Sequence, residues 1–402
     1  MKKIVFPAVA VLLALIVIAA TAEIGLRIYG LFDKKRGLKN CMGNINRKYC
    51  HGFNPGSRFR LIDGKHGEYN VGVRINNYGF RGQDIKKEKD PFAYRIMAMG
   101  DSFTFGVGAG EKETIPYLIE KILAKKGRNA EVINAGFGSY SPLLHSLKVT
   151  REYAEFKPDL VLYFFDFSDL ADDWRYEKNL VYDSSGGVLR SDPAFIDGKR
   201  DWWKTMRIYS KLCVYIHNKV VRLIGKIQIL GFKNYVKAKL EGKRAKSLIV
   251  AKVAEKKKLN PIEYDGYLMI RGRDRLPEIT KHFKRNEKYL NIIKDALAAR
   301  GIQMVLVIYP YGIHVGPDHW GAGRAYWGFE KGRTYDDYYA FDLLEDYAAR
   351  NHISCINLLP AFLKNKDKKD LFFDIDGHFT PEANHIAARA ITNSPVFKKA
   401  LE

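Results

Sequence analysis

Five short apolar runs alternate along this chain with segments of helical periodicity, and no other feature limits its fold as strongly. The apolar runs cover residues 96–99, 132–134, 160–165, 304–309 and 353–356. Helical spacing of apolar residues covers 114–126, 142–155, 286–299, 335–350 and 381–392. Strands that are separated by helices pair in parallel, because each connection crosses a face of the sheet. The sequence therefore predicts an α/β fold with a central parallel sheet between two layers of helices.

The first apolar run ends abruptly in a turn that carries a hydroxyl group. Residues 95–106 are RIMAMGDSFTFG, so Gly100 closes the run and Ser102 follows almost directly. Ligands of open parallel sheets bind beyond the carboxyl ends of the strands, so a serine in this turn faces the binding crevice. Ser102 is therefore a candidate nucleophile. An Asp-Ser pair is also an ordinary helix cap, and this segment alone leaves both roles open.

A histidine and two aspartates stand near the carboxyl end of the chain. Residues 373–382 are FDIDGHFTPE, which places Asp376 and Asp374 just before His378 and ahead of a helix that begins around Pro381. A serine nucleophile needs a base, and the base needs a carboxylate that orients it. We expect His378 to be this base, with one of the two aspartates as its partner.

With these two motifs the chain resembles the SGNH or GDSL hydrolase family over roughly residues 70–395. The resemblance implies a flavodoxin-like sheet and a Ser-His-Asp site in which Ser102 is the nucleophile and His378 the base. The acid two residues before the histidine also recurs in envelope-anchored relatives, which favours Asp376 over Asp374. The resemblance implies no cofactor, and no Cys/His spacing suggests a zinc site.

Two further loops match positions where this family stabilises the oxyanion. Residues 134–142 are NAGFGSYSP, and alignment on Tyr140 puts Ser139 where the family usually has a glycine, with Gly138 one residue earlier. Backbone N–H groups of such a loop can bind the developing negative charge. After the third apolar run, Ser168-Asp169 stands where the family normally has Asn-Asp. The Ser168 hydroxyl is a hypothetical donor in place of the asparagine, and the alternative is that the acidic residues 166–173 form a polar loop.

The amino end predicts export of the chain. Lys2 and Lys3 precede an uncharged, largely apolar run over residues 4–22, which is long enough for a membrane helix. We expect an anchor over 1–32, with a cleaved signal peptide as the alternative, because Ala20-Thr21-Ala22 has the form of a cleavage site. Residues 33–92 are predicted to be a stalk and lead-in. In an exported chain Cys41 and Cys50 plausibly form a disulfide, and two thiols in a stalk are the alternative.

A basic segment interrupts the predicted hydrolase between its third and fourth strands. Residues 201–290 hold 23 Lys and Arg against 8 Asp and Glu, a net charge of +15 out of a formal +22 for the chain. Residues 209–230 and 235–253 mix apolar and basic side chains as amphipathic helices do. We interpret 201–285 as a helical cap, with contact to anionic headgroups as the next choice. No nucleic-acid recognition motif is present.

The predicted domain order is anchor, stalk, hydrolase over 93–200, basic insertion and hydrolase over 286–402. The leading hypothesis is a membrane-anchored serine esterase whose domain lies outside the cytoplasm and acts on acyl esters of envelope carbohydrate or lipid. An O-acyltransferase with the same three residues is the first alternative. A non-catalytic carbohydrate- or partner-binding module on the same fold is the second. His314 and His319, on a long loop, are expected to be surface residues, with contact to substrate as the alternative.

Overall fold

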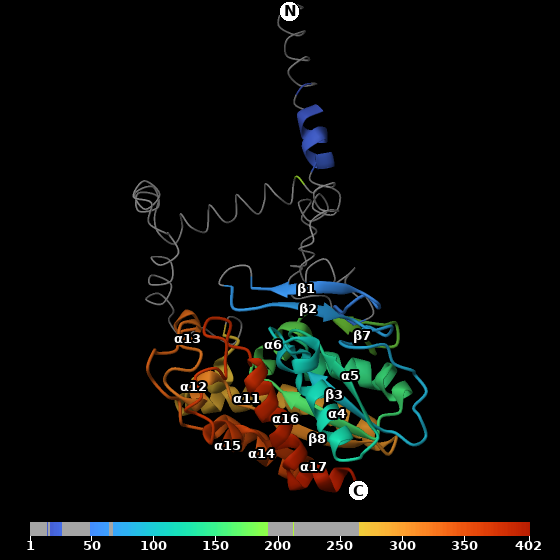
Figure 1. Ribbon diagram of the computed structural model, residues 1–402, viewed down its shortest axis with the longest axis vertical. Coiled ribbons are helices and arrows are strands. Elements are labelled where there is room, and N and C mark those ends of the chain that lie inside the picture. The colour runs from blue at the N-terminus through green and yellow to red at the C-terminus, as the bar shows by residue number, and fades with distance from the viewer. Residues whose placement is uncertain (1–13, 15–16, 26–48, 64–66, 192–211, 213–264) are drawn as a thin grey trace, which may run out of the picture. The chain divides into compact units, whose positions relative to one another are not determined.

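The computed structural model describes residues 14, 17–25, 49–63, 67–191, 212 and 265–402 (Figure 1). The chain divides into two compact units, Met1–Arg36 with Phe195–Lys257 and Gly37–Ala194 with Lys258–Glu402. Most of the first unit lies outside the described residues. The same holds for most of the predicted anchor, for Cys41, and for all but Leu212 of the two predicted amphipathic helices. Within the described residues no helix is both long and apolar enough to span a bilayer. The rest of this section concerns the second unit.

The second unit is built on a five-stranded parallel sheet. Its strands are β3 (Tyr94–Gly100), β4 (Ala130–Gly136), β5 (Leu160–Phe165), β8 (Gln303–Ile308) and β9 (Ser354–Asn357). They lie in the order β4-β3-β5-β8-β9, which is the flavodoxin-like order 2-1-3-4-5. All five predicted strands are present, and the predicted parallel sheet is confirmed.

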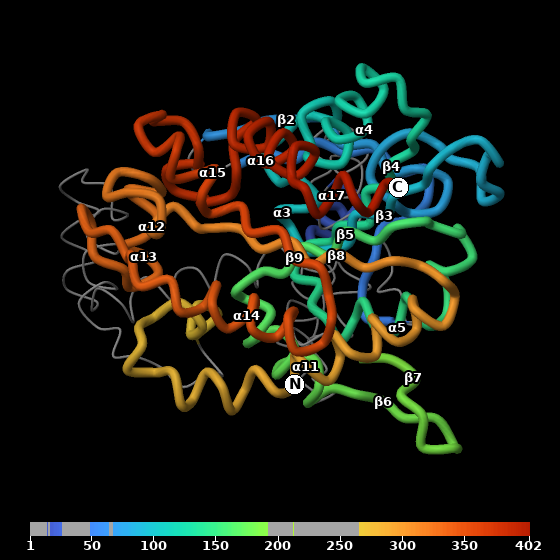
Figure 2. The backbone as a smooth tube through the Cα atoms, turned by 90° about the horizontal axis from the view of Figure 1, so that it is seen from below, coloured from blue at the N-terminus to red at the C-terminus, as the bar shows by residue number. Residues whose placement is uncertain are grey.

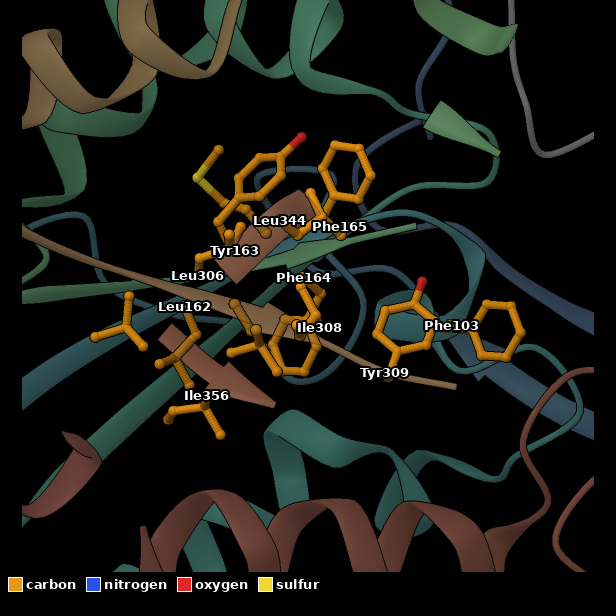
Figure 3. Packing of buried hydrophobic residues seen from close by; sticks show 14 of the residues in the cluster. Phe103, Leu162, Tyr163, Phe164, Phe165, Leu306, Ile308, Tyr309, Leu344 and Ile356 are labelled. Carbon is orange, nitrogen blue, oxygen red and sulfur yellow. The ribbon is translucent and has the colours of Figure 1, made fainter. Parts of the chain in front are cut away.

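Helices cover both faces of this sheet, which explains why its central strands are continuously apolar. Figure 2 shows α4 (Ile115–Lys125), α15 (Leu359–Leu363), α16 (Pro381–Asn393) and α17 (Pro395–Ala400) on one side of the strands. On the other side lie α5 (Pro142–Arg151), α11 (Leu276–Ala298) and α14 (Tyr339–Arg350). Every residue of β5 is buried between the layers, and Figure 3 shows side chains of β5 and β8 packed together.

Several elements were not predicted from the sequence. They are the helices α3 (Ser102–Phe105), α6 (Asp169–Glu177), α12 (Gly312–Val315), α13 (Gly323–Tyr326), α15 and α17, and the antiparallel pairs β1 (Arg58–Ile62) with β2 (Asn70–Arg74) and β6 (Leu180–Tyr182) with β7 (Val188–Ser191). Short 3-10 turns occupy Glu111–Glu113, Tyr153–Phe156, Leu268–Ile270 and Arg273–Arg275. Helix α11 also starts at Leu276, inside the segment that we assigned to the insertion.

The described part of the expected stalk and lead-in folds against the hydrolase core. In β1 and β2 the inward side chains Phe59, Leu61 and Val73 form a second apolar cluster with Phe105. Phe53 stacks on the rings of Phe59 and Phe105 at centroid distances of 5.7 and 5.1 Å. The lead-in is thus bound to the helix that carries Ser102.

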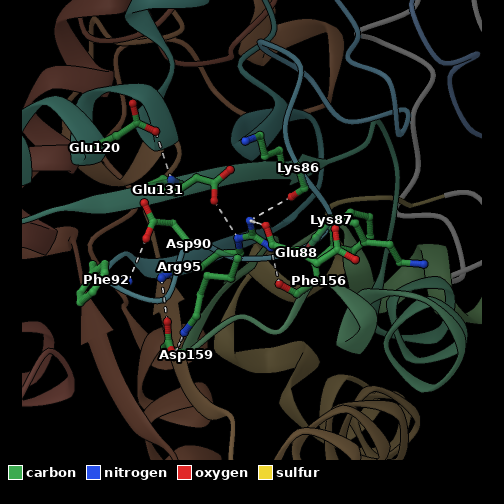
Figure 4. Close-up of polar contacts among 12 residues, drawn as sticks. Lys86, Lys87, Glu88, Asp90, Phe92, Arg95, Glu120, Glu131, Phe156 and Asp159 are labelled. Carbon is green, nitrogen blue, oxygen red and sulfur yellow. Dashed lines mark hydrogen bonds and ion pairs between the residues drawn. The ribbon is translucent and has the colours of Figure 1, made fainter.

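Arg95 connects the lead-in to the amino end of strand β3, opposite the end that carries Ser102. It lies at the start of β3, is 1% exposed, and places Nε 2.7 Å from a carboxylate oxygen of Glu131 (Figure 4). Its remaining donors reach the carbonyl oxygens of Lys86, Lys87, Glu88 and Phe156. A buried guanidinium is tolerated when its donors are satisfied in this way. Strand β3, whose carboxyl end leads into the turn of Ser102, is therefore held firmly near its amino end.

Candidate active site

The turn after β3 places Ser102 at the first position of a short helix. A side chain at Gly100 would put its Cβ 2.2 Å from Thr104 Oγ1 and 2.9 Å from the Phe164 backbone oxygen, so the turn needs glycine here. Asp101 caps α3 by accepting the Phe103 N–H at 2.9 Å. As the first residue of α3, Ser102 has no acceptor within the helix for its own N–H. The chain leaves β3 and β5 toward opposite edges of the sheet, so this turn lies at a topological switch point.

The structure brings the three predicted catalytic side chains together. Ser102 Oγ lies 2.7 Å from His378 Nε2, although the two residues are 276 positions apart. The other ring nitrogen, Nδ1, forms a short hydrogen bond with Asp376 Oδ1. About a fifth of the His378 side chain and a quarter of the Asp376 side chain are exposed, so the site opens to solvent. Asp374 instead accepts the Ala322 N–H at 3.1 Å and is exposed.

Charge at this site favours a protonated imidazole and an ionised carboxylate. Burial alone would lower the pKa of His378, but the charge and hydrogen bond of Asp376 outweigh burial and raise it above its ordinary value. Burial likewise opposes ionisation of Asp376, yet His378 and the hydrogen bonds to this carboxylate lower its pKa to about 2. Asp376 is therefore a carboxylate throughout the physiological range, as an orienting acid must be.

A buried carboxyl group lies directly beside the nucleophile. The Ser102 hydroxyl is 3.0 Å from Asp101 Oδ2, which offers its proton a second acceptor. Burial, with the nearby charge of Asp166, raises the pKa of Asp101 to about 7. The Phe103 ring packs against the imidazole of His378 at a centroid distance of 4.7 Å. Sequence reasoning missed both roles, although both residues stand within the motif that carries Ser102.

The predicted oxyanion loop lies at the end of β4, next to β3 in the sheet. Ser139 is exposed and adopts a left-handed conformation with φ of 58°. Its carbonyl oxygen accepts the Tyr176 hydroxyl at 2.8 Å, and the Gly138 carbonyl lies 2.8 Å from His51 Nε2. Both carbonyl oxygens of this pair therefore have hydrogen-bond partners. The N–H groups of Gly138 and Ser139 meet no acceptor among the described residues.

Within the described residues, no hydrogen bond or ion pair joins Ser168 or Asp169 to the other predicted site residues. The Ser168 N–H donates to Asp166 Oδ1 at 2.7 Å, and no hydrogen bond of its hydroxyl occurs within the described residues. Asp169 is 1% exposed and begins α6, where its carboxylate accepts the Asp166 N–H. Burial and neighbouring carboxylates raise the pKa of Asp169 well above its ordinary value. The alternative of a polar loop over 166–173 is wrong, because residues 169–173 begin helix α6 and the four aspartates of this segment are buried.

Partners from the loop after β8 make this acidic cluster tolerable in the interior. The Asp166 carboxylate accepts the hydroxyls of Tyr309 at 2.7 Å and Tyr311 at 2.5 Å. The expectation that His314 and His319 are surface residues is also wrong, since they are 2% and 4% exposed. Within the described residues no group of three or more histidine, cysteine or acidic side chains is arranged to hold a metal ion.

A family profile described as the SGNH hydrolase-like domain of acetyltransferase AlgX matches residues 264–396, which include Asp376 and His378. This match identifies residues 264–396 as an SGNH hydrolase-like domain, in agreement with the resemblance to the SGNH/GDSL hydrolase family. Members of this family act on ester bonds as hydrolases or acyltransferases, and this chain is such an enzyme. No curated protein matches it.

Solved structures, an acetyl xylan esterase and a GDSL-like lipase among them, align with most of this chain at low sequence identity. The structure of TesA aligns with a TM-score of 0.37 and 13% identity over 76% of this chain and 99% of its own. The acetyl xylan esterase AlAXEase aligns with a TM-score of 0.36 and 15% identity over 74% and 98%. A GDSL-like lipase from Bacteroides thetaiotaomicron aligns with a TM-score of 0.34 and 11% identity over 79% and 93%.

Proposed function

We propose that the chain is a membrane-anchored serine esterase that acts on acyl esters, most simply acetyl esters, of envelope carbohydrate or lipid. The observation that carries this proposal is the 2.7 Å contact between Ser102 Oγ and His378 Nε2, with Asp376 on the far side of the ring. Such a chain of contacts makes a hydroxyl nucleophilic at neutral pH.

In the proposed reaction Ser102 Oγ attacks the ester carbonyl while His378 Nε2 takes the hydroxyl proton. The carbonyl oxygen becomes an oxyanion, which the N–H groups of Ser102 and Ser139 stabilise, with Gly138 beside them. When the intermediate collapses, the C–O bond to the alcohol breaks and His378 returns its proton to the departing oxygen. Water then attacks the acyl-serine, again losing its proton to His378, and releases the acid and free Ser102.

Acyl transfer is the second candidate, because the matching family profile is described by an acetyltransferase. The chemistry is the same until the acyl-serine forms, and a sugar hydroxyl then replaces water. A binding module without turnover is the remaining alternative, and an unreactive Ser102 would favour it.

The nucleophile is tested by labelling the full chain with a fluorophosphonate probe. We expect the natural chain to be labelled and Ser102→Ala to remain unlabelled. Ser185→Ala is the control, because Ser185 is an exposed serine in the turn between β6 and β7 that bonds only to Asp183 among the described residues. Labelling that persists in folded Ser102→Ala protein, or is absent from the folded natural chain, refutes the proposal.

Hydrolysis and transfer are separated by the fate of a labelled acetyl group. With p-nitrophenyl acetate as donor, an esterase releases acetate at the same rate with or without an acetyl-free envelope glycan, whereas a transferase moves label to the glycan. The proposed anchor is tested by comparing the full chain with a chain lacking residues 1–32. We expect only the full chain to stay in the membrane fraction after a high-salt wash, and its release would contradict the anchor.

A further inference from the structure

The segment between β1 and β2 reaches the loop that carries Asp376. Glu68 stands two residues before β2, and its carboxylate accepts two successive backbone N–H groups of that loop. The Ile375 N–H donates to Oε1 and the Asp376 N–H to Oε2, each at 2.8 Å. Because both oxygens are used by neighbouring amides, the contact sets both the position and the orientation of this stretch of backbone.

Tyr69, the next residue, acts on the side chain of the same aspartate. Its hydroxyl donates to Asp376 Oδ2 at 3.0 Å, while Oδ1 faces His378 Nδ1. Each carboxylate oxygen thus has a separate partner, and rotation of the carboxylate would break both contacts. The ring of Tyr69 packs on Phe373 at a centroid distance of 5.1 Å, which holds the hydroxyl in place.

The loop is held from its opposite side by a different part of the chain. The Gly323 N–H donates to the Asp374 carbonyl at 2.8 Å, and Trp320 Nε1 donates to the Ile375 carbonyl at 3.3 Å. These contacts bind the backbone carbonyls of Asp374 and Ile375, and neither involves the Asp376 carboxylate. Apart from His378, the side chains that hydrogen-bond to Asp376 within the described residues come from the hairpin of β1 and β2.

We propose that Glu68 and Tyr69 are positioning residues of the active site, which fix Asp376 so that it orients His378 toward Ser102. This inference rests on the proposed function, because it assigns their effect to the triad. An acid orients an imidazole well only when the acid is itself held in place. Residues that hold it therefore affect the catalytic rate without touching the substrate. The hairpin is therefore part of the catalytic machinery, although Glu68 and Tyr69 are more than 300 positions from their partner.

The test measures p-nitrophenyl acetate hydrolysis by Tyr69→Phe and Glu68→Gln in the full chain, each in the natural and the Asp376→Asn background. We expect each change to lower kcat by about 10-fold with KM nearly unchanged, the size of effect expected when one hydrogen bond to a charged group is lost. In the Asp376→Asn background we expect less than about a 2-fold further effect, because residues acting through Asp376 have nothing left to position.

Two controls separate positioning from general damage. Arg60→Ala removes a contact to Asn70 within the same hairpin, and Tyr347→Phe removes a buried hydroxyl contact to Asn291 elsewhere. Both should retain kcat within about 2-fold of the natural chain, since neither touches Asp376. If Glu68→Gln fails to fold, Tyr69→Phe carries the test, because it keeps the ring and its packing on Phe373.

Two results overturn the inference while leaving the proposed function intact. One is a kcat for Tyr69→Phe that equals those of the controls. The other is a decrease in kcat that is equally large in the Asp376→Asn background, which would assign the hairpin a purely structural role. Failure of the proposed function is distinct, because turnover would then survive in Ser102→Ala.

Discussion

Arg81 offers a severe test of how the structure holds the helix of Ser102. Its guanidinium is 4% exposed and donates to the carbonyl oxygens of Phe105, Gly106 and Ala109 at 2.7, 2.6 and 2.6 Å. It also lies over the Phe105 ring at 4.8 Å. Burial lowers the pKa of Arg81 to about 10, so the group stays charged at neutral pH. We predict that Arg81→Met destabilises the fold strongly.

The size of the effect follows from the three carbonyls. Each buried acceptor that loses its donor costs about 1–3 kcal/mol. Removing the guanidinium recovers part of this, because the charge no longer has to be buried, and methionine keeps the packing on Phe105. We therefore expect the free energy of unfolding to fall by about 3–5 kcal/mol, the lower part of the range for three unsatisfied acceptors. A domain with an ordinary stability of about 5–15 kcal/mol would be measurably folded after this loss.

The assay is urea unfolding of the full chain followed by tryptophan fluorescence, with the slope against urea compared between variants. Arg74→Met is the matched control. Arg74 is paired with Asp84 at 2.6 Å, but the two side chains are 31% and 57% exposed, so its loss should cost less than about 1 kcal/mol. If Arg81→Met loses no more stability than Arg74→Met, the three carbonyl contacts do not contribute as the structure implies.

Three further predictions concern the acid, the base and a crowded glycine. Asp376→Asn should lower kcat by roughly 10⁴, as expected when the orienting acid is lost, and a rate near that of the natural chain would contradict its role. Because only neutral His378 can take a proton and its pKa is raised, kcat/KM should rise with pH through a midpoint above the ordinary value of 6.5, and Asp376→Asn should move that midpoint to lower pH. A midpoint that Asp376→Asn leaves in place would show that the carboxylate does not raise the pKa. Gly108→Ala should destabilise the fold more than Gly127→Ala in the urea assay. Both glycines have positive φ, 79° and 74°, so the backbone cost is similar. A Cβ at Gly108 would lie 2.3 Å from the Phe373 ring, whereas one at Gly127 meets nothing within 4 Å. Equal losses of unfolding free energy in the two variants would contradict the predicted clash with Phe373.

The sheet and the nucleophile were predictable because their signals are local. A strand covered on both faces must be apolar at every position, so β5 and β8 stand out without any knowledge of their partners. Ser102 follows directly from the strand that carries it, and the rule for parallel sheets assigns this turn to the binding edge. His378 was recognisable in the same way, from a short motif just ahead of α16.

The acidic segment after β5 shows where local reasoning failed. Asp169 and its neighbours looked solvent-exposed, because carboxylates are rarely buried without partners. Those partners are the hydroxyls of Tyr309 and Tyr311 on Asp166, and the amide of Asn286, which reaches Asp173 at 2.7 Å. They come from the loop after β8 and from α11, so no window of sequence around Asp169 contains them.

The sequence by itself determined that this chain forms a helix-covered parallel sheet with a serine at one strand end and a histidine near the carboxyl terminus. The two-residue spacing favoured Asp376 over Asp374 as the partner of that histidine, but only the tertiary structure shows their separate contacts, Asp376 with His378 and Asp374 with Ala322. Only the tertiary structure also drew the lead-in hairpin into the site. Periodicity reports whether a residue is buried, whereas the identity of its partner depends on how distant segments pack.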